Sequence, residues 1–171
     1  MAARALLRPF IAFALTVTLF VGCGSDDDSS TADEYLLELQ SAFDRADVRF
    51  QPLTETINQD FGSESEEITA WREFFAADLE ILNDLLDEIR NLNPPGELED
   101  EHQQLVEGGD ELVQAISETR DDIGDVTSKA ELEELLESPA LDERTNRFDS
   151  ACIQLQQAAD SRGIEVDLDC E

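Results

Sequence analysis

Positive charge is scarce in this sequence: 11 Lys and Arg residues stand against 42 Asp and Glu residues. Proteins bind nucleic acids by neutralising the negatively charged phosphates with Lys and Arg. Anionic lipid head groups are negatively charged too, so they repel an acidic surface. The composition therefore predicts no nucleic-acid partner and no peripheral binding to anionic lipids. It favours a solvated, self-repelling surface, and it leaves open a role in binding cations or a basic partner.

The residues and motifs of common catalytic sites are also scarce. The sequence has one histidine, His102, and its only methionine is Met1. It contains no G-x-S-x-G elbow, no phosphate-binding P-loop and no C-x-x-C pair. Nucleophilic catalysis by a Ser-His or Cys-His pair would have to use His102, and copper(I) would lack its usual methionine and free thiol ligands. We therefore expect no enzyme and no bound cofactor.

The apolar run near the start of the chain is short. It covers 13 residues from Phe10 to Gly22, whereas an α-helix needs about 20 apolar residues to cross a bilayer. The run follows MAARALLR, which has two arginines and no acidic residue. A basic start before a short apolar run is typical of secretory signals, so residues 1–22 are predicted to be a signal peptide.

A cysteine follows this run directly. Val21-Gly22-Cys23, continued by the polar string GSDDDSSTAD, resembles the lipobox of bacterial lipoproteins, with Phe20 where leucine is usual. The resemblance implies cleavage before Cys23 and lipidation of Cys23, which would anchor the protein in the cell membrane on its extracytoplasmic side. Residues 24–33 have no large apolar side chain and are predicted to be a flexible acidic tether. The alternative is ordinary cleavage and a secreted protein.

Removal of residues 1–22 would leave 149 residues, and we expect a single domain over residues 34–171. Nine basic residues would then face 42 acidic ones, a net charge of −33. With Cys23 assigned to lipid, Cys152 and Cys170 remain as a pair. A cysteine pair outside the cytosol is expected to oxidise, and a helix followed by an extended return can bring the two together, which predicts a structural disulfide.

Apolar residues recur at steps of three and four in four segments, the pattern of helices with one buried face. These segments are about 36–61, 65–92, 98–126 and 139–163, and a short helix is predicted between Ser128 and Glu137. Strand-forming patterns are nearly absent. The sequence therefore predicts an all-α fold, an antiparallel four-helix bundle with a short extra helix and a disulfide-stapled C-terminal tail.

Three features predict interruptions of these helices. Pro52 predicts a kink or two helices in succession, because proline removes a backbone hydrogen bond. The stretch Asn93-Pro94-Pro95-Gly96 predicts a turn, with Pro95 or Gly96 as the first residue of the next helix. Gly108-Gly109 predicts a bend or a close contact between helices, with Trp71 as the candidate partner.

The third segment holds the candidate metal ligands. Glu99 and His102 are three residues apart, so they take neighbouring positions on one helix face. Ferritin-like di-iron bundles have such a pair on each of two helices, and the missing second histidine excludes that type of site. One interpretation is a single cation held by Glu99, His102 and carboxylates from other helices. The other, which we favour, is a partly buried or hydrogen-bonded His102 that sets the helix register.

Two further motifs extend the likeness to bacterial lipoproteins. N-P-P-G-E-L-E-D-E-H-Q-Q-L at 93–105 and C-I-Q-L-Q-Q-A-A-D-S-R-G-I-E-V-D-L-D-C at 152–170, together with the lipobox, resemble uncharacterised exported helical lipoproteins of bacteria. The resemblance implies a shared fold and disulfide, and no activity or ligand. We expect a membrane-anchored structural or interaction module with an envelope protein as partner. The alternative is a module that binds a metal cation or a small basic ligand through Glu99 and His102.

Overall fold

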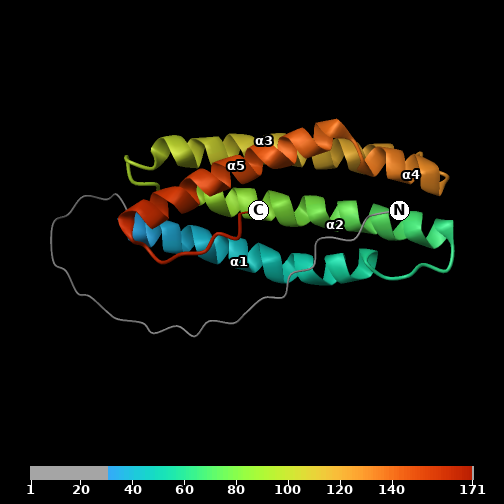
Figure 1. Cartoon of the computed structure of the whole chain (residues 1–171), viewed down its shortest axis with the longest axis horizontal. Coiled ribbons are helices and arrows are strands. Elements are labelled where there is room, and N and C mark those ends of the chain that lie inside the picture. Colours follow the sequence, from blue (N-terminus) through green and yellow to red (C-terminus); the bar gives the residue numbers. More distant parts are fainter. Residues whose placement is uncertain (1–30, 171) are drawn as a thin grey trace.

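The computed structural model describes residues 31–170, so the predicted signal peptide, Cys23 and most of the predicted tether lie outside the described residues. Five helices and no strand form within this range. They are α1 (Ala32–Ile57), α2 (Glu64–Asn91), α3 (Glu99–Asp122), α4 (Lys129–Leu136) and α5 (Pro139–Arg162). The four long helices lie side by side, and α4 connects α3 to α5 (Figure 1). The predicted all-α bundle with a short extra helix is confirmed.

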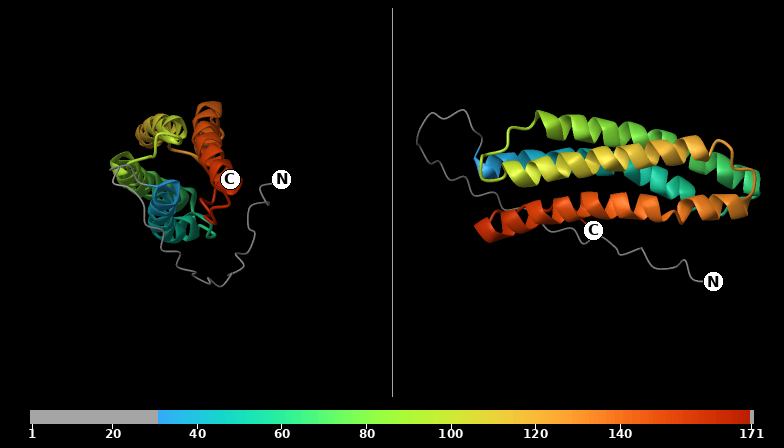
Figure 2. Two further views of the ribbon diagram at one scale, coloured as in Figure 1. Left: turned by 90° about the vertical axis from the view of Figure 1, so that its left-hand side faces the viewer. Right: turned by 90° about the horizontal axis from the view of Figure 1, so that it is seen from above.

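The order of neighbours in the bundle follows the chain. Helix α2 packs against α1 and α3, helix α5 packs against α3, and α4 packs against α2. Seen end-on, α1 and α5 close the arrangement, and the C-terminal residues run back between them (Figure 2). We call the line along which α1 and α5 face each other the α1–α5 seam. Their backbones approach each other less closely than those of the other neighbouring long helices.

The core is built from the apolar stripes of all the helices and from the C-terminal residues. The largest fully buried side chains are Tyr35, Leu36, Leu39, Leu86, Ile89, Leu98, Leu105, Ile123, Leu132, Leu155 and Leu168. Buried residues recur at steps of three and four within the helices, as the sequence predicts, for example at Phe75, Asp78, Leu82, Leu86 and Ile89 of α2. Burial of each large apolar side chain stabilises the fold by about 1.5–3 kcal/mol.

Helix α1 begins earlier than the sequence analysis expects and is not divided. The Thr31 side chain accepts a hydrogen bond from the Glu34 backbone N–H, and the Glu34 carboxylate accepts one from the Thr31 backbone N–H. This capping box starts the helix at Ala32, so the end of the predicted tether is helical. Pro52 lies inside α1, and the helix continues to Ile57, so the alternative of two successive helices is wrong and the kink stays a prediction.

Helix α3 is shorter than predicted at both ends. The Leu98 N–H donates to the Pro95 carbonyl at 2.8 Å, which closes a turn before the helix begins at Glu99. Neither Pro95 nor Gly96 opens the helix, which corrects the prediction. At the other end the Arg72 guanidinium of α2 donates to carbonyls that follow Asp122. The acceptors are the carbonyl oxygens of Ile123 (3.0 Å), Gly124 (3.0 Å) and Val126 (2.9 Å).

The glycine pair of α3 lies where three helices approach closely. A Cβ atom on Gly109 would overlap the Leu86 side chain of α2. A Cβ atom on Gly108 would lie 3.2 Å from the Cα atom of Phe148 in α5. The predicted close helix contact is therefore present, but Trp71 is not the partner.

Candidate functional site

The candidate ligand His102 lies at the end of the bundle where α1 and α3 begin. Its Nδ1 atom is 2.9 Å from the hydroxyl oxygen of Tyr35, and the two rings meet edge to face with centroids 5.7 Å apart. Tyr35 is completely buried in the first turns of α1, and His102 is partly buried in the first turn of α3. The hydrogen bond fixes these two helices relative to each other, as the favoured interpretation of His102 predicts.

Burial keeps both members of this pair neutral at neutral pH. Desolvation lowers the pKa of His102, because the imidazolium ion loses contact with water. Desolvation, with a smaller contribution from the Glu101 carboxylate, raises the pKa of Tyr35 well above its usual value. In the tautomer with the proton on Nε2, the Tyr35 hydroxyl donates to Nδ1 of His102. That ring nitrogen is then not available to a metal ion.

The other candidate ligand, Glu99, is exposed to solvent in the first turn of α3. Among residues 31–170 no three His, Cys, Asp or Glu side chains lie close enough together to hold a metal ion. The structure therefore brings no third ligand to Glu99 and His102. A cation site at these two residues stays a prediction.

The two cysteines within residues 31–170 form the predicted pair. Cys152 of α5 and Cys170 near the C-terminus are joined as a disulfide, with their Cα atoms 5.6 Å apart and a sequence separation of 18. Gly163 ends α5 in the left-handed conformation, with φ at 71°, and so turns the chain back. Cys152 is 2% exposed, and Cys170 is partly exposed.

The chain between these cysteines ends in an extended C-terminal arm, which we define as residues 164–170. Val166 and Leu168 are buried, while Glu165, Asp167 and Asp169, which alternate with them, are exposed. The Gln156 amide of α5 pairs with the backbone of the arm. Its Nε2 donates to the Val166 carbonyl at 3.0 Å, and its Oε1 accepts from the Leu168 N–H at 2.9 Å.

The free energy of docking this arm is finely balanced. Burial of two apolar side chains stabilises it by about 2 kcal/mol each and two hydrogen bonds by about 1 kcal/mol each. A disulfide over a loop of this length adds about 3 kcal/mol by restricting the unfolded chain. Ordering the backbone of seven residues costs about 1–2 kcal/mol per residue, which is of the same size as all of these gains together. The disulfide is therefore a substantial part of the free energy that keeps the arm docked.

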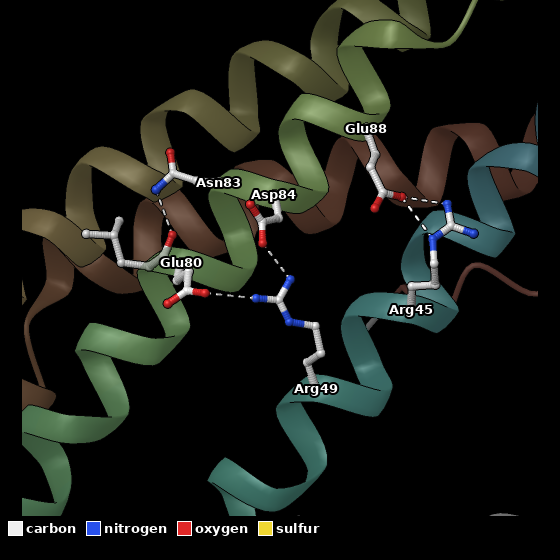
Figure 3. A network of polar contacts seen from close by, with 7 residues as sticks. Arg45, Arg49, Glu80, Asn83, Asp84 and Glu88 are labelled. Atoms are coloured by element: carbon white, nitrogen blue, oxygen red, sulfur yellow. Dashed lines mark hydrogen bonds and ion pairs between the residues drawn. The ribbon is translucent and has the colours of Figure 1, made fainter.

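All the basic side chains of the described residues are engaged within the molecule. Across α1 and α2, Arg45 binds Glu88, and Arg49 binds Glu80 and Asp84 (Figure 3). The remaining ion pairs are Arg90 with Asp87 and Asp110, Arg120 with Asp121, Lys129 with Glu67, Arg144 with Glu118, Arg147 with Glu111 and Glu143, and Arg162 with Glu97. Arg72 binds the backbone carbonyls described above. Most of the surplus acidic side chains face solvent.

One carboxylate lies inside the bundle. Asp78 of α2 is 6% exposed, and it completes the buried stripe between Phe75 and Leu82. Burial raises its pKa to about 7, since desolvation is the cause of the shift. The apolar pattern of the sequence did not single out Asp78, Tyr35 or Gln156.

Two surface hollows lie on the α4 and α5 side of the molecule. The larger, of about 550 Å³, opens widely to solvent and is lined by Val126, Glu131, Glu134, Leu135, Glu137, Ser138 and Pro139. The smaller is lined by Glu111, Gln114, Ala140, Glu143, Arg144 and Arg147. Neither hollow is lined by His102 or by the disulfide.

Comparisons with known proteins add no relative. A scan of protein-family models, a search of curated proteins and a search of solved structures each gave no match to this chain. None of the described helices is both long enough and apolar enough to span a membrane.

Proposed function

We propose that the protein is an exported lipoprotein, held at the extracytoplasmic side of the cell membrane by acyl chains on Cys23. The observation that best supports this proposal is the pairing of Cys152 with Cys170. Disulfides persist in oxidising compartments outside the cytosol. The pairing also leaves Cys23 as the remaining one of three cysteines, directly after a run with the features of a signal peptide.

We further propose that the helical bundle is a structural or interaction module whose partner is an envelope protein. Its described basic side chains are already bound by its own acidic groups or, for Arg72, by backbone carbonyls, so the surface offers carboxylates to a partner. A partner with a basic face would be attracted to such a surface, whereas nucleic acids and anionic lipids would be repelled. Tethering by residues 24–31 would leave the bundle free to reorient beside the membrane.

Mass spectrometry of the protein isolated from its native membranes tests the anchor. The expected mature N-terminus is Cys23 with diacylglycerol and further acylation, and the protein is expected in the membrane fraction. The matched variants are Cys23→Ser, which should lose the membrane association, and Cys170→Ser, which should keep it. An N-terminus at Met1, or a residue 23 without fatty acid, would reject the proposal.

A further inference from the structure

The C-terminal arm covers the α1–α5 seam of the bundle. It leaves the end of α5 and runs back between the two helices toward the middle of the molecule (Figures 1 and 2). Leu168, which is 1% exposed, and Val166 belong to the same buried cluster as Leu36 of α1 and Leu155 of α5. The arm therefore supplies apolar cover where the backbones of α1 and α5 do not approach closely.

Noncovalent contacts hold this arm weakly. Two buried side chains and the paired hydrogen bonds of Gln156 are set against the ordering of a whole extended segment. Beside the disulfide, Asp169 has φ at 49°, a left-handed conformation that residues with a Cβ atom rarely adopt. The Asp169 backbone N–H donates to the Asp167 carboxylate at 3.2 Å, and the adjacent Cys170 is bonded covalently to Cys152.

We propose that the Cys152–Cys170 disulfide is a reducible latch, whose opening by a dithiol reductant releases the C-terminal arm and uncovers the α1–α5 seam. The inference concerns the folded domain and does not depend on the lipid anchor. The Cys152–Cys170 disulfide is then a site of thiol–disulfide exchange as well as a structural bond.

The burial of the two sulfur-bearing residues sets the order of the reaction. Cys152 is buried, whereas Cys170 is partly exposed, so an incoming thiolate reaches Cys170. A bond forms between the reductant and the Cys170 sulfur, the Cys152–Cys170 bond breaks, and Cys152 leaves as a thiolate that takes up a proton. The second thiol of the reductant then attacks the mixed disulfide and releases Cys170 as a thiol. The protein disulfide gains two electrons, and the dithiol becomes a disulfide.

The test compares the oxidised full chain with the same chain treated with dithiothreitol under native conditions. Amide hydrogen exchange of Leu168 is followed by NMR, because its N–H is hydrogen-bonded to Gln156 in the docked arm. On reduction the protection of this amide is expected to fall by at least about tenfold, while amides at the α2–α3 contact change by less than about twofold. Unchanged protection in a chain with both thiols verified free would overturn the proposal, as would a disulfide that is reduced only after denaturation.

Two variants separate release of the arm from general loosening of the fold. Cys170→Ser removes the latch and is expected to reproduce the exchange of the reduced chain without any reductant. Glu165→Gln changes an exposed residue of the arm and is expected to keep the oxidised protection. A Cys170→Ser chain whose arm stays as protected as the oxidised wild type would again refute release.

The order of attack has its own measurement. The oxidised chain is treated with glutathione, quenched with acid and digested, and the mixed disulfide is located by mass spectrometry. Glutathione is expected on Cys170. Its presence on Cys152 would show that the buried sulfur is the one attacked and would overturn the assigned order.

Discussion

Two buried polar side chains, Asp78 and Tyr35, take positions that the helical stripes would otherwise give to apolar residues. Tyr35 has a partner in His102, so its hydroxyl group is buried at little cost. No hydrogen bond within the described chain reaches the Asp78 carboxylate, and ionisation at this position opposes folding. The two residues therefore affect stability in opposite directions.

Asp78→Asn is expected to stabilise the protein at pH 8 and to have little effect at pH 4. The Asp78 pKa is about 7 in the fold, against 3.8 for an ordinary aspartate, so the folded state holds the proton more tightly. Stability is therefore lost as the pH rises from about 4 through 7, by roughly 4 kcal/mol for a shift of this size. Urea unfolding of wild type and variant at both pH values measures the difference. The exposed control Glu55→Gln should show no such pH-dependent difference, and an equal effect of Asp78→Asn at both pH values would contradict the assignment.

Tyr35→Phe is expected to lower the free energy of unfolding by about 1 kcal/mol at pH 8, because it removes the hydrogen bond to His102. A double-mutant cycle with His102→Ala measures the pairwise energy, and simple additivity would show that the two side chains are not coupled. In the wild type, the single histidine is expected to titrate by NMR below the ordinary pKa of 6.5. Since that pKa is lowered in the fold, this contribution to stability is lost as the pH falls below 6.5.

At the scale of the helices, the sequence predicts what depends on local pattern and misses what depends on distant contacts. The stripes of the four long helices follow from spacing alone, and the pairing of Cys152 with Cys170 follows once Cys23 is assigned to lipid. The end of α3 at Asp122 does not, because Arg72 binds the following carbonyls from 51 or more residues away. The hydrogen bond between Tyr35 and His102 could not be predicted from the sequence either. The two residues are 67 positions apart, and periodicity does not fix how two helices are aligned along each other.

Gly109→Ala tests the close approach of α3 and α2. Alanine favours a helix over glycine by about 1 kcal/mol, but the added methyl group would overlap Leu86, and overpacking costs about 1–3 kcal/mol. A net loss of about 1–2 kcal/mol in the free energy of unfolding is expected from chemical denaturation. Gly96→Ala is the matched control, because no atom lies within 4 Å of the added group and its effect should stay within about 0.5 kcal/mol. A Gly109→Ala protein as stable as wild type would show that the helices can separate without cost.

For the molecule as a whole, the placement of charge matters more than the count of ion pairs. The basic residues lie mostly between helices, where Arg45, Arg90 and Arg147 each reach an acidic side chain on a neighbouring helix. Such exposed pairs contribute little individually. The larger effect is repulsion among the surplus acidic groups. The full sequence has a net charge of −31, and this repulsion destabilises the compact folded state.

Sodium chloride is therefore expected to stabilise the protein. The Debye length falls from about 30 Å at 0.01 M to about 8 Å at 0.15 M ionic strength, so repulsion between distant carboxylates is screened while core packing is unaffected. A rise of several degrees in Tm over this range is expected, measured by circular dichroism. Calcium or zinc at about 1 mM in 0.15 M sodium chloride should add less than about 1 °C, because only a ligand bound preferentially to the fold raises Tm further. A larger, saturating rise that disappears in His102→Ala would instead favour the cation-binding alternative, since unspecific screening does not depend on one imidazole.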